Sequence, residues 1–193
     1  MNKLNIMIVG VGGQGTLLAS RVLGRVALKK DFDVKVSEVH GMSQRGGSVV
    51  TYVRMGARVF SPLIEKGEAD VILAFEKLEA FRWADYLNPD GTMIVNTQQI
   101  DPMPVITGTA KYPESIIEKL TGKIKHIAAV DALKTARECG NIKAVNIVLI
   151  GLLAKSIPFE KEVWLEAIRE VVPAKVLEVN LRAFEAGYSA GTK

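Results

Sequence analysis

The sequence has one cysteine, Cys139, and two histidines, His40 and His126, among its 193 residues. A single cysteine cannot form a disulfide within the chain, and it cannot supply the four ligands of an iron–sulfur cluster. So few cysteine and histidine ligands also argue against a zinc site. If the chain takes part in redox chemistry, another chain or a bound cofactor must therefore carry the electrons.

Long apolar runs and concentrated charge are also lacking. No apolar run reaches the roughly 18 residues of a membrane span. The net charge is +4, from 25 Lys and Arg against 21 Asp and Glu. This excess is spread along the chain, without the basic runs typical of nucleic-acid binding, and it is compatible with an anionic ligand or an acidic partner. The chain enters its first apolar run without a basic leader or cleavage site, so we expect a cytoplasmic protein.

The clearest local pattern lies in the first 30 residues. An apolar run at residues 6–9 predicts a strand, and apolar positions over residues 16–30 recur at helical spacing. Between them lies the glycine turn, which reads Gly10-Val11-Gly12-Gly13-Gln14-Gly15 and fits G-x-G-x-x-G. Such a turn lets a ligand approach the backbone, and the free N–H groups of the following helix favour an anion. A turn that serves only close packing fits the same spacing, and both interpretations stay open.

A second strand is predicted at residues 34–39, with Glu38 near its end. A ribose-binding acid of a dinucleotide fold lies about 20 residues beyond the glycine motif, which is near the position of Glu38. A solvated carboxylate at a strand end is the plainer interpretation of this residue.

The polar segment follows at once and reads His40-Gly41-Met42-Ser43-Gln44-Arg45-Gly46-Gly47. Open α/β sheets bind ligands at the carboxyl ends of their strands, where this segment is expected. The forked guanidinium of Arg45 suits phosphate or carboxylate, and the glycines permit close backbone approach. An ordinary surface loop with a hydrogen-bonded histidine is the alternative, but eight donor-rich residues without a core pattern favour a function.

The remaining pattern predicts an α/β fold, a Rossmann-like three-layer open sheet that is mainly parallel. Residues 48–55 and 58–60 are expected to form a β-hairpin that adds an antiparallel strand. Residues 88–91 read as a turn, and residues 101–104 as an extended crossover. The further strands are predicted at 70–75, 92–96 and 125–129, and the further helices at 76–86, 113–120, 131–138, 141–156, 160–171 and 174–188.

The last three helices form a helical C-terminal segment, about 141–193, within a single domain spanning 1–193. One helix has a small, apolar face of Ala144, Ile147, Val148, Gly151 and Leu152. This face suits tight packing, either against another subunit or inside the chain's own core. A homodimer is a further possibility for the isolated chain.

The glycine turn and the polar segment, at this spacing, resemble the gamma-type subunit of 2-oxoacid:ferredoxin oxidoreductases. Within that group the chain is most similar to the beta subunit of indolepyruvate:ferredoxin oxidoreductase. The resemblance extends over nearly the whole chain, including the strand at 70–75 and the helical tail. The glycine turn occurs in many folds, so the polar segment is the more specific part.

The resemblance implies an enzyme that oxidatively decarboxylates a 2-oxoacid, indolepyruvate or a related acid, with coenzyme A. The products would be an acyl-CoA, carbon dioxide and reduced ferredoxin. Thiamine diphosphate and the iron–sulfur clusters would lie on a larger partner subunit, ferredoxin would be reached through the complex, and this chain would bind no cofactor tightly. The gamma-type domain would pack over the partner's thiamine site and serve the coenzyme A-dependent step, and the isolated chain would be inactive.

The residues expected to contact cofactor or co-substrate are Gly10, Gly12, Gly13, Gln14, Gly15, Glu38, His40, Ser43, Gln44, Arg45, Gly46 and Gly47. No catalytic residue or metal ligand is assigned to this chain, and neither nucleic acid nor membrane is expected as a partner. Two other functions remain open: an autonomous nicotinamide or flavin oxidoreductase, and a nucleotide-sensing module. The lack of a recognisable substrate domain or acid–base pair counts against the first of these.

Overall fold

The computed structural model describes residues 3–40 and 46–191. Six strands form one sheet in the order β2-β3-β1-β4-β5-β6. β3 is antiparallel to both of its neighbours, whereas β1, β4, β5 and β6 run parallel. The strands are β1 (Lys3–Val11), β2 (Asp33–His40), β3 (Ser48–Gly56), β4 (Ala69–Ala74), β5 (Leu87–Asn96) and β6 (His126–Val130).

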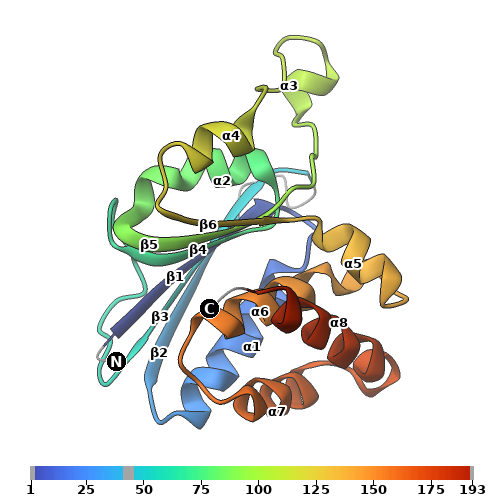
Figure 1. Cartoon of the computed structure of the whole chain (residues 1–193). Coiled ribbons are helices and arrows are strands. Elements are labelled where there is room, and N and C mark those ends of the chain that lie inside the picture. Colours follow the sequence, from blue (N-terminus) through green and yellow to red (C-terminus); the bar gives the residue numbers. More distant parts are fainter. Residues whose placement is uncertain (1–2, 41–45, 192–193) are drawn as a thin grey trace.

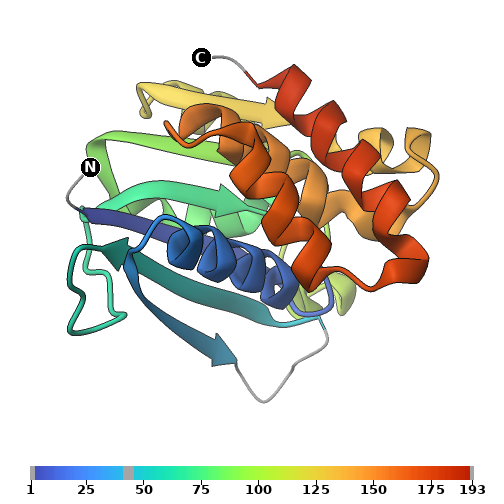
Figure 2. The same ribbon diagram turned by 90° about the horizontal axis from the view of Figure 1, so that it is seen from below.

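Helices cover both faces of this sheet (Figure 1). One face carries α2 (Lys77–Trp83) and α4 (Ile116–Thr121), and the other carries α1 (Thr16–Lys29), α6 (Val145–Ser156), α7 (Lys161–Val171) and α8 (Leu177–Ala190). Figure 2 shows α1 and the C-terminal helices together on their shared face. The remaining helices are α5 (Ala132–Glu138), the short α3 (Met103–Ile106) and the 3-10 turns η1 (Ala84–Tyr86), η2 (Ile142–Ala144) and η3 (Ala174–Val176).

The central strand β1 shows why the apolar run at residues 6–9 has no alternation. Its side chains point to opposite faces in turn. Ile6 and Ile8 pack into the core with α1 and α6, while Met7 and Val9 pack into the core on the α2 face. A strand buried on both faces needs apolar residues at every position. The expected three-layer, mainly parallel α/β fold with a helical C-terminal segment is therefore confirmed.

The helix α6 is apolar on all sides and packs against α8. Its small face is buried within the chain, with Gly151 set against the backbone of α8 and Gly187 of α8 set against the carbonyl of Val148. The interpretation of this face as part of the chain's own core is confirmed. The face is not available to a second copy.

The prediction that residues 58–60 pair with β3 in a hairpin is wrong. Residues 58–60 form no strand, because β3 already pairs along both edges, with β2 and with β1. Val59 is instead buried and donates its N–H to Asp33 Oδ2 at 2.9 Å, and the guanidinium of Arg58 lies over the Phe60 ring. The antiparallel pairing expected of a hairpin occurs between β2 and β3.

Three further boundaries differ from expectation. Residues 88–91 belong to β5, whose pairing with β4 shifts register between Ala69 and Val71, so turn-forming residues are accommodated in an irregular strand. Residues 103–106 form the single turn α3 after Pro102, rather than only an extended crossover. The expected helix at 113–120 begins at Ile116. Within the described residues no helix is long and apolar enough to cross a membrane.

Candidate functional site

The glycine turn and the end of the polar segment lie side by side at the carboxyl edge of the sheet. The N–H of Gly12 donates to the carbonyl of Gly47 at 2.9 Å, and the N–H of Gly46 donates to the carbonyl of Gly12 at 3.4 Å. Two stretches that are more than 30 residues apart in the sequence are therefore joined through their backbones. The structure brings together the two motifs that carry the family resemblance.

The side chain of Gln14 holds the glycine turn in shape. Its Oε1 accepts from the N–H of Val11 at 2.8 Å, and its Nε2 donates to the carbonyl of Phe75 at 2.9 Å, just beyond β4. A Cβ atom on Gly10 would lie 2.9 Å from both Gln14 Oε1 and Phe75 Cβ. Gly10 is therefore needed for close packing, and Gln14 fixes the turn against the next strand.

Gly15 ends the turn in a conformation that suits glycine. Its φ is +84°, and its carbonyl accepts from Asn146 Nδ2 at 3.3 Å, which joins the start of α1 to the first turn of α6. A Cβ on Gly15 would lie 2.6 Å from the same Nδ2 atom. Left-handed backbone and steric crowding thus both require glycine here.

Replacing Gly15 with alanine is expected to lower the free energy of unfolding by about 1–2 kcal/mol, because alanine is strained at this φ and displaces the Asn146 amide. Gly24→Ala is the matched control on α1, since a Cβ there meets nothing within 4 Å. The control should be neutral or stabilising by up to about 1 kcal/mol. Urea denaturation measures both, and equal stabilities for the two variants would contradict the assigned role of Gly15.

A hollow of about 460 Å³, here called the glycine-turn hollow, opens beside this turn. It is lined by Gly13, Gln14, Gly15, Gln98, Leu133, Ile142, Lys143 and Val145. The N-terminal ends of α1 and α6 both form part of its wall, and the side chain of Lys143 adds a positive charge. Because helix N-termini carry partial positive charge, the hollow favours negatively charged groups. Sequence reasoning missed Lys143 because it is more than 120 residues from the glycine turn; the one available signal was its place directly before an apolar helix.

A second hollow of about 360 Å³, here called the arm hollow, is lined in part by Val11, Gly46 and Gly47. Its other lining residues include Glu76, Glu79 and Arg82, together with residues of the segment around α3. Glu79 is 4% exposed and accepts hydrogen bonds from Ser48 Oγ and, at 3.3 Å, from Trp83 Nε1. The bond to Ser48 fixes the first residue after the polar segment.

The remaining candidate residues are Glu38 of β2 and four residues of the polar segment. Glu38 accepts from Ser20 Oγ of α1 at 3.0 Å, and β3 lies between its strand and β1. Since neighbouring strands are about 4.8 Å apart, Glu38 is set one strand further from the glycine turn than a ribose-binding acid would be. Ser43, Gln44 and Arg45, and the side chain of His40, lie outside the described residues.

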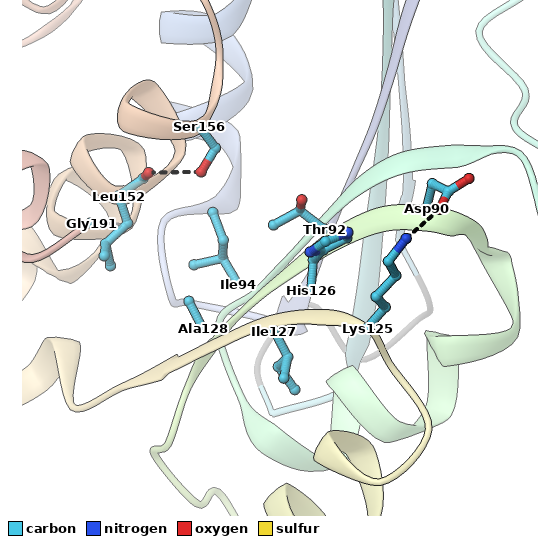
Figure 3. A pocket seen from close by; sticks show the side chains of 10 residues that line it. All are labelled: Asp90, Thr92, Ile94, Lys125, His126, Ile127, Ala128, Leu152, Ser156 and Gly191. Atoms are coloured by element: carbon cyan, nitrogen blue, oxygen red, sulfur yellow. Dashed lines mark hydrogen bonds and ion pairs between the residues drawn. The ribbon is translucent and has the colours of Figure 1, made fainter. Parts of the chain in front are cut away.

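Another hollow, of about 510 Å³, lies at the amino ends of β5 and β6 (Figure 3). Lys125 and Asp90 pair there at 3.1 Å, and both side chains are more than half exposed. An exposed pair of this kind contributes little to stability. This hollow is on the opposite edge of the sheet from the glycine turn, so it takes no part in the site described above.

Comparison with known proteins identifies the family. Residues 5–190 match the model described as pyruvate ferredoxin/flavodoxin oxidoreductase. The chain is 46% identical over 197 residues to the indolepyruvate oxidoreductase subunit IorB of Thermococcus kodakarensis, covering 98% of this chain and 96% of that protein.

Solved structures share the fold. The keto/oxoacid ferredoxin oxidoreductase gamma subunit of Geobacter sulfurreducens matches with a TM-score of 0.73 and 23% identity over 97% of each chain. The 2-oxoglutarate:ferredoxin oxidoreductase of Magnetococcus marinus matches with a TM-score of 0.74 and 19% identity over 98% of this chain and 31% of that one. The resemblance inferred from the glycine turn and the polar segment is confirmed, and the chain belongs to the pyruvate ferredoxin/flavodoxin oxidoreductase family as a gamma-type subunit.

Proposed function

We propose that the chain is the gamma-type subunit of an indolepyruvate:ferredoxin oxidoreductase or of an enzyme for a related aryl or keto acid. The observation that carries this proposal is the full-length identity of 46% to a protein named as an indolepyruvate oxidoreductase subunit. The complete enzyme would convert the 2-oxoacid and coenzyme A to an acyl-CoA, carbon dioxide and reduced ferredoxin. Residues 1–193 would form one domain, including the helical tail from about residue 141, and would act in the cytoplasm.

A larger partner subunit would hold thiamine diphosphate and the iron–sulfur clusters and would pass electrons to ferredoxin. Thiamine diphosphate supplies the carbanion stabilisation that decarboxylation requires. This chain offers one half-buried thiol, Cys139, and within residues 3–40 and 46–191 no group of three side chains suited to a metal ion. Its own residues do not fit an iron–sulfur cluster, which supports this division of labour. The homodimer expected of the isolated chain would need a surface other than the α6 face.

The role we assign to this chain is to close over the partner's active site and to bind coenzyme A. The joined glycine turn and polar segment supply backbone that can approach a neighbouring surface closely. The glycine-turn hollow, with two helix N-termini and Lys143, suits the phosphate groups of coenzyme A. His40, Ser43, Gln44 and Arg45 of the polar segment would complete the contacts to the phosphates. Glu38, which lies one strand further away, would contact only an uncharged part of the co-substrate.

The isolated chain is expected to be colourless and inactive with any 2-oxoacid, because its residues offer no site for an iron–sulfur cluster. The test is to purify it alone, to record its visible absorbance and to assay 2-oxoacid-dependent ferredoxin reduction. Iron–sulfur absorbance, or turnover without a partner, would contradict the proposed division of labour.

An autonomous nucleotide-binding protein is the second candidate, favoured by the glycine turn at the N-terminus of α1. The position of β3 between β1 and β2 counts against it, since Glu38 is separated from the turn by one strand. Calorimetric titration of the isolated chain with NAD, NADP and FAD separates the two proposals. Micromolar binding of a dinucleotide would favour the second candidate, and its absence together with binding to the larger subunit would favour the first.

A further inference from the structure

A segment of the chain projects from the layers above the carboxyl edge of the sheet. Residues 101–111, here called the arm, include α3, which stands away from the other helices (Figure 1). Met103 and Ile106 of the arm are 67% and 66% exposed, and among the large apolar side chains of the described residues Phe60 alone is more exposed. The two residues are three positions apart on one helical turn and so lie on the same face. Exposed apolar side chains that cluster in this way, unlike single ones, can form a contact surface.

The arm is nevertheless well ordered by hydrogen bonds of its own. The N–H of Val105 donates to the carbonyl of Pro102 at 2.9 Å, and the N–H of Ala110 donates to the carbonyl of Pro104 at 2.9 Å. Thr109 Oγ1 also donates to the carbonyl of Pro104, at 3.0 Å. The arm is therefore a folded projection that presents Met103 and Ile106 in a fixed arrangement.

One buried carboxylate holds both ends of the arm. Glu76, which is 1% exposed, accepts from the N–H of Ile100 at 3.2 Å and from the hydroxyl of Tyr112. The same carboxylate caps α2 by accepting from the N–H of Glu79 at 3.0 Å. Burial, and then the bond to Glu76, raise the pKa of Tyr112, so its hydroxyl stays protonated and can donate at neutral pH.

The arm and the polar segment share a wall. Met103, Pro104 and Ile106 line the same arm hollow as Gly46 and Gly47. A surface that docks on Gly46 and Gly47 therefore also meets the arm. Under the proposed function that surface belongs to the larger subunit, whose active site the polar segment is proposed to face.

We propose that Glu76 is a positioning residue, which clamps the arm at Ile100 and Tyr112 so that Met103 and Ile106 dock on the larger, thiamine-binding subunit. This inference rests on the proposed function. Glu76 itself is buried beneath the arm and acts through it. The interaction expected is apolar, between the two exposed side chains of the arm and an apolar patch on the partner.

The test measures the dissociation constant between this chain and the larger subunit from the same genome, by calorimetric titration. Ile106→Asp should raise the constant about tenfold or more, because it places a charge in an apolar contact. Leu63→Asp is the matched control: Leu63 is 58% exposed and lies between β3 and β4 at the opposite edge of the sheet, so the dissociation constant should not change. Equal effects of the two variants would overturn the proposal.

Tyr112→Phe removes one of the clamping bonds and leaves the cap of α2 in place. It should raise the dissociation constant roughly five- to tenfold, as expected for one lost hydrogen bond. Limited proteolysis within the arm should become faster. The melting temperature of the isolated chain should also fall, by roughly 2–6 °C, because a buried carboxylate loses one donor; the change in the dissociation constant is therefore the deciding measurement. Glu76→Gln should raise the dissociation constant and the rate of proteolysis within the arm by larger factors. If Glu76→Gln fails to fold, the results for Tyr112→Phe and Ile106→Asp still test the proposal.

Two failures can be told apart. If the wild-type chain does not bind the larger subunit at all, the proposed function fails. If the wild-type chain binds and both Tyr112→Phe and Ile106→Asp bind equally well, the positioning role of Glu76 fails while the proposed function stands. A melting temperature that falls in Tyr112→Phe without any change in the dissociation constant would show that the clamp is merely structural.

Discussion

Replacing Gly187 with alanine is expected to lower the free energy of unfolding by about 2–3 kcal/mol. A Cβ at this position would overlap the carbonyl of Val148, where α8 crosses α6. Overpacking usually costs about 1–3 kcal/mol, and the upper end applies here because backbone faces backbone and neither side can rotate away. The intrinsic gain of alanine over glycine in a helix, about 1 kcal/mol, is smaller than this cost. The steric cost therefore exceeds the gain in helix propensity, and the variant is expected to be less stable.

Urea denaturation or thermal unfolding of the isolated chain measures this change. Ser189→Ala is the matched control, because Ser189 is an exposed residue of α8 and its substitution keeps the crossing with α6 intact. The control should change stability by no more than about 0.5 kcal/mol. A Gly187→Ala variant as stable as the control would show that the two helices are not as close as described.

Replacing Arg45 with alanine is expected to slow the assembled enzyme roughly ten- to a hundredfold, or to weaken its use of coenzyme A by a similar factor. The loss of a charge-assisted hydrogen bond to an anion costs about 1.5–3 kcal/mol. Arg45→Lys should recover part of the loss, because a point charge does not reproduce the planar fork of the guanidinium. The dependence of ferredoxin reduction on coenzyme A concentration measures the effect.

Arg21→Ala is the control for this prediction, since it removes the same charge from the exposed side of α1. It should leave turnover and the coenzyme A dependence unchanged. The alternative role of Arg45, pairing with a local carboxylate such as Glu38, predicts a lower melting temperature of the isolated chain and unchanged kinetics. Normal kinetics in the assembled Arg45→Ala enzyme would end the assignment.

The parts of the fold that were predicted correctly are those that depend on residues close together in the sequence. The continuous apolar residues of β1 and the apolar face of α6 indicate buried elements, and the glycines before α1 indicate a tight turn. Residues 58–60 were misread as a strand because β-branched and aromatic residues there fit an edge strand equally well. A hairpin would need a free edge on β3, but β3 pairs with both β1 and β2. The pairing with β1 joins residues far apart in the sequence, so no local pattern indicates it.

The candidate site shows the same division. The glycine turn and the polar segment were found from their spacing and glycine content. The hydrogen bonds that join Gly12 to Gly46 and Gly47 could not be read from the sequence, and neither could the approach of Lys143 or the clamp at Glu76. Each of these depends on how distant elements of the sheet and helices are placed, which no local pattern records.

The most direct test of the central claim is reconstitution with the larger subunit. The isolated chain is titrated into that subunit, and indolepyruvate-dependent reduction of ferredoxin is measured with and without coenzyme A. The account predicts that the rate rises with added chain, saturates at a fixed ratio of the two subunits and requires coenzyme A. A larger subunit that is fully active alone, or one that neither binds the chain nor gains activity from it, would contradict the account.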